Sequence, residues 1–294
     1  MDLATFLVQC LNALQYGLLL FLVASGLTLI FGIMGVINLA HGSFYMIGAY
    51  MAYALAPWVA LSFGGGFFST LLVGLALSVV LGYVLEWAFY SYLYEREHLQ
   101  QVLMTYGLIL VFEELRSLLV GDDVHGVKPP ALLAGTIPLG ELMTYPVYRL
   151  FVSGVCLALA AAMWWVLART RLGMAVRAGA TNREMVQSLG IDISMLYRVV
   201  FAAGVAIAVF AGMVAAPVSS VYPGMGQQVL IVCFVVVVIG GIGSVRGAML
   251  AAILIGIVDT FGKVLVPEVA GAGVYVLMAL ILLWKPEGLF RAGS

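Results

Sequence analysis

Polar side chains interrupt a long apolar stretch near the start of the chain. Asn38, His41 and Ser43 follow one another between two apolar runs, and Gly35 and Gly42 lie beside them. Inside a membrane, polar side chains are costly and tend to face protein or a water-filled path. Unwound backbone is tolerated at that depth only where it is buried in protein or lines a cavity. Asn38, His41 and Ser43 are therefore candidates for a translocation pathway, or else they cap helix ends and hold a packing joint.

Acidic residues occur inside two other apolar runs. Glu113 precedes Arg116 by three residues and Asp259 precedes Lys263 by four, which are the spacings of ion pairs on a helix. Pairing is one explanation for these acids. The alternative is that Glu114 and Asp259 face inward and belong to the candidate translocation pathway.

The composition decides the class of protein. The 294 residues are 64% hydrophobic and 9% charged, and the mean hydropathy is +1.14. These values predict an all-α, polytopic membrane bundle that forms a single domain over 1–294. A formal net charge of −1 offers no field suited to nucleic acid. Cys10, Cys156 and Cys233 all fall in apolar runs, so we expect packed thiols rather than disulfides or metal ligands.

Nine apolar runs are candidates to cross the hydrocarbon core. They are 6–33, 43–61, 67–90, 102–120, 151–167, 199–216, 229–242, 248–266 and 274–284. A further break among Gly32, Gly35 and Gly42 would add a crossing, so we expect eight to ten. Glu86 lies one turn from the end of its run, and we expect it to reach the membrane interface.

Residues 169–198 form a polar island between two of these runs. The island contains five of the thirteen basic residues, namely Arg169, Arg171, Arg177, Arg183 and Arg198. Thr181 and Glu184 have the spacing of a capping box, which predicts that a helix starts at Thr181. Gly190 is suited to the left-handed conformation that ends a helix.

The island therefore predicts two short helices. Met185, Val186 and Leu189 would form the apolar face of the second helix, while 172–178 would form the first, with Gly179 between them. An alternative is an interfacial helix that lies among lipid headgroups with its arginines on phosphates.

The distribution of basic residues predicts the orientation. The first group comprises Arg96, the island, Arg246, Lys285 and Arg291, and the second comprises Lys128, Arg149 and Lys263. By the positive-inside rule the first group is cytoplasmic. The coupling island at 169–198 and the C-terminus then lie inside the cell, and the loop at 121–147 is extracytoplasmic.

Part of the island resembles the cytoplasmic coupling loop of permease subunits of ABC importers. Glu184, Met185, Val186 and Gly190 match its Glu-Ala-Ala-x-x-x-Gly core, with Met and Val in place of the two alanines. The Ile-x-Leu-Pro tail of the fuller motif is absent, which argues against the maltose-type branch. The resemblance implies that this loop docks on a separate ATPase subunit. The implied coupling residues are Arg177, Thr181, Asn182, Glu184, Met185, Leu189 and Gly190.

Other motifs narrow the resemblance to branched-chain amino acid ABC importer permeases. They are GLTLIFG at 26–32, INLAHG at 37–42 with GAY at 48–50, GGIGS at 240–244 with GA at 247–248, and WKPEGLF at 284–290. The likeness extends from about Tyr16 to Phe290, and the chain is similar to the shorter of the two permeases that such operons usually encode. Free backbone groups near Asn38 could then bind an amino-acid zwitterion transiently.

The resemblance implies an ABC importer permease fold in the bacterial inner membrane. It implies cytoplasmic ABC ATPase subunits, a second permease subunit that is a paralogue, and a periplasmic or lipid-tethered solute-binding protein. The chain has no phosphate-binding Gly-x-x-x-x-Gly-Lys-Ser/Thr motif and no catalytic or metal-ligating motif. We therefore expect no cofactor and no enzyme activity of its own.

A transporter of another class is the alternative function. Asn38, His41, Glu114 and Asp259 could form a proton or Na⁺ relay in an ion-coupled secondary transporter or channel. That protein would move its substrate without an ATPase.

Overall fold

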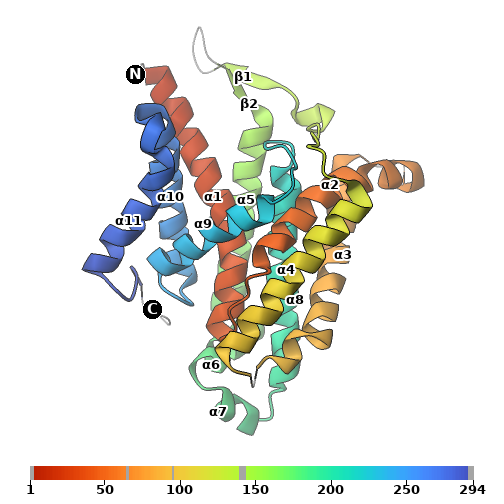
Figure 1. Cartoon of the computed structure of the whole chain (residues 1–294), viewed down its shortest axis with the longest axis vertical. Coiled ribbons are helices and arrows are strands. Elements are labelled where there is room, and N and C mark those ends of the chain that lie inside the picture. Colours follow the sequence, from red (N-terminus) through yellow and green to blue (C-terminus); the bar gives the residue numbers. More distant parts are fainter. Residues whose placement is uncertain (1–2, 64–65, 95, 139–143, 291–294) are drawn as a thin grey trace.

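The computed structural model describes residues 3–63, 66–94, 96–138 and 144–290, which form a bundle of helices (Figure 1). Nine long helices and two short ones, α6 (Arg171–Thr181) and α7 (Arg183–Ser188), lie in these ranges. The long helices are α1 (Leu3–Met34), α2 (His41–Phe63), α3 (Phe67–Ala88), α4 (His98–Val120), α5 (Val147–Arg169), α8 (Ile193–Ala215), α9 (Met225–Gly240), α10 (Val245–Leu265) and α11 (Ala270–Trp284).

Helix α1 runs through the middle of the molecule and packs against α8 and α10 (Figure 1). Its residues are apolar on every side, which is the pattern of a helix surrounded by protein or lipid. Gly17 meets the backbone of α10, where a Cβ would lie 2.9 Å from the Ala252 carbonyl oxygen. Gly26 meets α8, where a Cβ would lie 2.7 Å from the Gly204 carbonyl oxygen. Small residues therefore allow α1 to approach both neighbours closely.

Helix α8 is the second central element, and α2 and α3 pack against it. Gly82 of α3 lies against Ala202, and a Cβ there would come within 2.7 Å of the Ala202 Cα. On α8 itself, Gly212 lies against the backbone of Tyr45 in α2. Glycines on α3 and α8 thus allow close helix pairs here as well.

Several helices start earlier than the apolar runs suggest, because polar side chains cap them. The Asp192 side chain accepts a hydrogen bond from Met195 N, so α8 begins at Ile193 instead of 199. Ser244 caps α10 in the same way through Gly247 N. The break near the N-terminus falls after Met34, with Gly35 at φ +66°, whereas Gly32 lies within a continuous α1.

The loop at 121–147 contains a short hairpin that the sequence did not predict. Strands β1 (Thr136–Pro138) and β2 (Thr144–Pro146) pair antiparallel, and the residues between them lie outside the described ranges. Earlier in the same loop, near the end of α4, His125 pairs with Val221, so this segment lies against the chain that follows α8. Helix α5 then begins at Val147 rather than at 151.

Six of the described helices are long and apolar enough to cross a membrane, and they are α1, α2, α3, α5, α8 and α10. Helices α9 and α11 are apolar but shorter. Helix α4 has the length but carries Glu113, Glu114 and Arg116. Nine crossings therefore remain a prediction, while the multi-pass architecture is clear.

Two groups of basic residues lie at opposite ends of the bundle. Since α1 and α10 run antiparallel, Gly17 pairs with Ala252 and Gly32 with Gly243. Arg246 therefore lies at the end of the bundle that holds α6 and α7, and Lys263 lies at the hairpin end. The other basic residues follow the same division. Arg96, the island and Lys285 lie at the α6–α7 end, and Lys128, Arg149 and Arg116, which binds Asp122 at the start of the 121–147 loop, lie at the hairpin end. Arg291 lies outside the described residues.

Candidate functional site

The break between α1 and α2 forms a buried joint, which we call the α1–α2 joint (residues 35–43). Asn38 is 0% exposed, and its Oδ1 accepts a hydrogen bond of 2.7 Å from the hydroxyl of Tyr90. Tyr90 lies in the 3-10 turn Tyr90–Tyr92 after α3, and its ring packs at 4.3 Å between centroids on Phe201 of α8. The joint thus ties α1 and α2 to α3 and α8.

His41 is the first residue of α2 and is also fully buried. Its Nε2 lies 2.9 Å from the Val23 carbonyl oxygen in the middle of α1, so the ring donates there as the Nε2–H tautomer. Among the described residues, His41 Nδ1 and Asn38 Nδ2 have no hydrogen-bond partner. An unpaired acceptor and an unpaired donor at this depth are able to hold a water molecule or a polar group in transit.

Segments with family-like motifs come together near this joint. Gly32 lies against Gly243 in the glycine-rich turn before α10. On the other side of that turn, the amides of Leu289 and Phe290 donate to the carbonyls of Ile239 and Gly240. Gly241, at φ +96°, leaves no room for a side chain beside Phe290. The late glycine turn therefore connects α1 to the C-terminal tail.

The polar island folds as two helices, although with different limits from those expected. Helix α6 continues through Gly179 to Thr181, whose hydroxyl donates to the Arg177 carbonyl, so Thr181 is not a helix cap. Asn182 caps α7 instead, because its Oδ1 accepts from Met185 N at 3.0 Å. The prediction of a capping box that starts at Thr181 is therefore wrong. Glu184 lies in the first turn of α7, where its negative charge interacts favourably with the helix dipole.

The end of α7 is as the sequence predicts. Gly190 has φ +82°, its amide donates to the Gln187 carbonyl, and the Ile191 amide donates to the Val186 carbonyl. This is the Schellman arrangement of a C′ glycine.

The α6–α7 segment (residues 171–190) leaves large apolar side chains in solvent. Val186 is buried, but Met185 and Leu189 are 63% and 74% exposed, and Met174 is also exposed. Arg177 lies exposed beside them. An apolar patch with a basic rim at the tip of the molecule is typical of an interaction surface.

An internal network connects this segment to α3. The Glu86 side chain is 1% exposed and contacts Arg198 Nε at 3.2 Å, while the Tyr94 hydroxyl donates to Glu86 at 2.6 Å. Tyr94 packs on Tyr197, and the Arg183 guanidinium of α7 lies 5.5 Å from the centre of the Tyr197 ring. Glu86 therefore does not reach the membrane interface, because protein partners satisfy it inside the bundle. Burial also raises the pKa of the Tyr94 hydroxyl.

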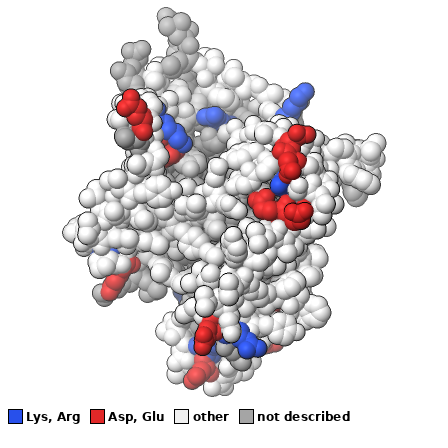
Figure 2. Space-filling model, viewed as in Figure 1, with Lys and Arg blue, Asp and Glu red and all other residues white. Residues whose placement is uncertain are grey.

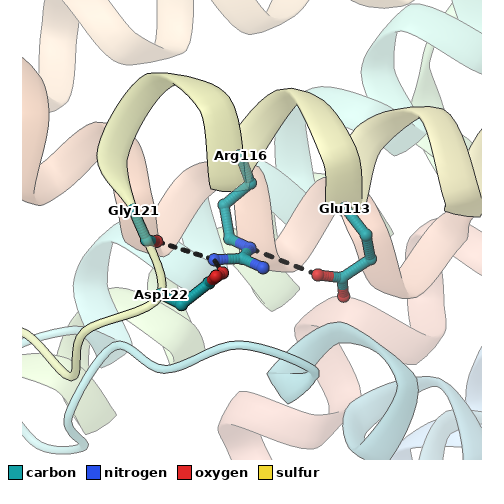
Figure 3. A network of polar contacts seen from close by, with 4 residues as sticks. All are labelled: Glu113, Arg116, Gly121 and Asp122. Atoms are coloured by element: carbon teal, nitrogen blue, oxygen red, sulfur yellow. Dashed lines mark hydrogen bonds and ion pairs between the residues drawn. The ribbon is translucent and has the colours of Figure 1, made fainter.

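The predicted pair of Glu113 and Arg116 is present within a wider network (Figure 3). Arg116 lies 3.2 Å from Glu113, 2.7 Å from the Gly121 carbonyl and 2.9 Å from Asp122. The hydrogen bond from Arg116 lowers the pKa of the Asp122 carboxyl. Arg116 thus binds the first residues after the C-terminal end of α4. Glu114 is exposed and takes no part in this network.

Asp259 forms its predicted pair with Lys263, at 2.6 Å. Ser43 is buried in the first turn of α2, beside His41. The structure therefore brings Asn38, His41 and Ser43 together at the joint, while Asp259 and Glu114 lie on α10 and α4.

Sequence reasoning missed the partners of these residues. Tyr90 and Arg198 each bind a buried polar group that is far away in the sequence, and no local pattern marks them. The only available signal was the need of a buried Asn or Glu for some partner.

Comparisons with known proteins agree with this architecture. The chain is 30% identical to the "High-affinity branched-chain amino acid transport system permease protein BraD" of Pseudomonas aeruginosa, over 97% of this chain and 95% of BraD. It is 29% identical to the LivH permease protein of Salmonella typhimurium, again over 97% and 95% of the two chains. A probable LivH of Methanocaldococcus jannaschii is 26% identical over 95% of this chain and 90% of the relative. A family model matches residues 9–284, and the chain therefore belongs to the family described as "Branched-chain amino acid transport system / permease component".

Proposed function

We propose that this chain is the membrane-spanning subunit of an ATP-driven importer for branched-chain amino acids or related small polar solutes. The names of BraD and LivH support the substrate class, since each is a branched-chain amino acid permease protein. In this proposal the chain forms part of the translocation pathway, with Asn38, His41 and Ser43 at its narrow joint. ATP is hydrolysed by a partner.

The exposed apolar patch on the α6–α7 segment is the observation that carries the proposal. Met185 and Leu189 expose most of their surface, although a monomeric protein gains by burying such side chains. A groove on a cytoplasmic ABC ATPase subunit would cover them, with Arg177, Asn182 and Glu184 at the rim. Gly190 fixes the angle at which the chain leaves α7.

The internal network supplies a route for coupling. A displacement of α7 would be transmitted to Tyr197 of α8 through the contact with Arg183. It would be transmitted from α8 to α3 through the ion pair between Arg198 and Glu86. Because α8 also packs on α1 and α2, its displacement would act on the α1–α2 joint. Alternating access would result from rigid movement of these helices.

The charge distribution supports a position in the bacterial inner membrane with the α6–α7 end in the cytoplasm. On the face in Figure 2, charged side chains lie over the upper half, at the lower left and at the lower tip, and an uncharged region crosses the molecule between the upper and lower groups. More basic residues lie at the α6–α7 end than at the hairpin end, as the positive-inside rule requires of a cytoplasmic side. The extracytoplasmic loop at 121–147 would then meet a periplasmic or lipid-tethered solute-binding protein. A paralogous permease would complete the pathway.

An ion-coupled carrier has less support. Its relay needs contacts among His41, Glu114 and Asp259, but His41 bonds to a backbone carbonyl and Asp259 to Lys263. Glu114 faces outward on α4.

A pull-down from native membranes tests the proposal. The tagged chain should co-purify with an ABC ATPase, and both Met185→Asp and Leu189→Asp should reduce the recovered ATPase activity at least about tenfold, because a buried charge replaces an apolar contact. Leu132→Asp is the matched control, since Leu132 is equally exposed but lies at the hairpin end. Undiminished ATPase recovery in both α7 variants, or uptake by the chain alone on an ion gradient, would contradict the proposal.

A further inference from the structure

A pocket with a largely apolar wall and a few polar side chains opens near the hairpin end of the bundle, between α1, α5 and α10. Its volume is ≈ 420 Å³, which lies in the range of about 300–1,000 Å³ typical of small-molecule sites. Tyr45 of α2 forms part of its wall, one helical turn beyond His41. The pocket therefore approaches the α1–α2 joint from the side opposite to α6 and α7. We call it the Arg149 pocket.

Charged groups of both signs line the Arg149 pocket. Arg149, in the first turn of α5, donates from Nη1 to Asn12 Oδ1 at 2.6 Å. Within the described ranges, no carboxylate lies at ion-pair distance from Arg149. Asp259 is on the α10 wall, where its Oδ2 accepts from Lys263 while Oδ1 takes no part in that bond. The pocket thus holds an uncompensated cation and a carboxylate with a free oxygen.

Gln15 is the second indication of a ligand. Its side chain lines the pocket and the residue is only 5% exposed, yet none of the hydrogen bonds found among the described residues involves its amide. The amide reaches the open space of the pocket, where a guest or a water molecule can pair with it. Leu19, Val218 and Val264 add aliphatic surface.

We propose that the Arg149 pocket is a receiving site for a zwitterionic aliphatic α-amino acid. Arg149 binds the carboxylate, the free oxygen of Asp259 with the Gln15 carbonyl binds the ammonium, and the aliphatic wall covers the side chain. A guanidinium suits a carboxylate because its planar donors match the two oxygens. The inference rests on the proposed import of amino acids, and it names the site at which this chain receives them.

The position of the pocket fits a weak, transient site. It is open, and Lys263 is exposed at its rim, so water competes for each polar contact. A substrate released by a binding protein would rest there before it passes Tyr45 and the joint.

Protection of an introduced thiol from modification tests the site directly. Ser219 is exposed and lines the pocket, so Ser219→Cys, combined with Cys10→Ser, gives a reporter for a membrane-impermeant thiol reagent. Cys156 and Cys233 are buried. In the complete complex reconstituted in vesicles, millimolar L-leucine should slow the modification. Neither 3-methylbutylamine, which lacks the carboxylate, nor 4-methylpentanoate, which lacks the ammonium, should protect to the same extent.

Two variants test which residue of the pocket binds the carboxylate of leucine and which binds its ammonium group. Arg149→Gln should raise the leucine concentration needed for half-protection about tenfold or more, because a charge-assisted hydrogen bond is lost. Asp259→Asn should weaken protection by leucine and leave the effect of 4-methylpentanoate unchanged. Arg96→Gln removes an exposed cation at the opposite end of the bundle and should behave like the parent. Equal recovery of each variant from size-exclusion chromatography shows that folding is intact.

The results distinguish a failure of the Arg149 pocket as a binding site from a failure of the proposed importer function. Absence of leucine protection in a complex that still imports leucine with ATP would overturn the Arg149 pocket alone. Equal protection in Arg149→Gln, or equal protection by leucine and 4-methylpentanoate, would also overturn it. Protection by leucine in a complex without ATP-dependent uptake would support the pocket and contradict the importer.

Discussion

Asn38 shows why a polar residue is tolerated in the middle of this bundle. Its Oδ1 is paired with Tyr90, and the Tyr90 ring is itself packed against Phe201. The side-chain amide therefore acts first as a structural connection from the α1–α2 joint to α3 and α8. Its unpaired Nδ2 leaves one hydrogen-bonding group for a water molecule or a passing solute.

Tyr90→Phe tests the structural part of that role. The change removes the Tyr90 hydroxyl and leaves the side-chain Oδ1 of Asn38 buried without a partner, which lowers the free energy of unfolding by about 1–3 kcal/mol. We expect a lower Tm for the purified protein in detergent. Tyr92→Phe is the control, because Tyr92 lies in the same 3-10 turn but is exposed. An unchanged Tm in Tyr90→Phe would mean that the hydrogen bond does not stabilise the joint.

At this scale the sequence was informative about residues and uninformative about partners. Asn38, His41 and Ser43 stood out because polar groups are rare in apolar runs, and the joint indeed contains all three. Glu86 was misplaced, since its distance from the end of the run gave no sign of Arg198. Partners separated by many residues depend on the packing of whole helices, which no local pattern specifies.

Close helix pairs depend on glycines at specific positions. Gly48 of α2 lies directly on the Val209 backbone of α8, where any Cβ would overlap a carbonyl oxygen. We expect Gly48→Ala to force α2 and α8 apart at a cost of about 1–3 kcal/mol, measured as a lower Tm and reduced membrane yield. Gly107→Ala in α4 is the matched control, because a Cβ there meets nothing within 4 Å. The control should be neutral or stabilising by at most about 1 kcal/mol, so equal losses in both variants would contradict this packing.

An ion pair joins α3 and α8 beside the α6–α7 segment, and we expect it to stabilise the bundle. Arg198→Gln leaves the buried Glu86 carboxylate with only Tyr94, so we expect a lower Tm. Arg198 is partly exposed, and screening by water moderates the loss. Adding Glu86→Gln to Arg198→Gln should recover part of the lost stability, since no uncompensated charge then remains.

A double-mutant cycle on Tm measures that coupling. Arg96→Gln is its control, because Arg96 is an exposed cation at the same end of the bundle. Strictly additive losses in the two single variants would show that Glu86 and Arg198 do not interact.

Helices were predictable as apolar runs, but their ends were not. Asp192 and Ser244 extend α8 and α10 beyond the apolar runs by capping them, and Asn182 rather than Thr181 begins α7. Two adjacent residues are both good caps, and the choice between them depends on whether α6 continues to Thr181. The β1–β2 hairpin was missed because three-residue strands give too little alternation to recognise.

The whole molecule is polarised along its helices. The hairpin lies at one end and the α6–α7 segment at the other (Figure 1). The residues that line the Arg149 pocket lie toward the hairpin end, and most basic residues lie toward the α6–α7 end. Helices α1 and α8 cross the distance between these ends, so a displacement at α7 can reach the pocket without a separate mobile domain. In the proposed importer, the pocket would face outward and the α6–α7 segment would face the ATPase.

Side-specific labelling of cysteines tests this orientation. Ser188→Cys in α7 should react with an impermeant thiol reagent only in inside-out vesicles, and Leu132→Cys near the hairpin only in intact spheroplasts, each combined with Cys10→Ser. Both positions are exposed, so reactivity depends on the side and not on burial. We expect this orientation because basic residues are in excess at the α6–α7 end, and cytoplasmic loops of membrane proteins are enriched in Lys and Arg. Labelling of both positions from the same side would mean that α5, the one long helix described between them, does not cross the membrane. Labelling with the sides exchanged would place the α6–α7 segment beyond the reach of a cytoplasmic ATPase.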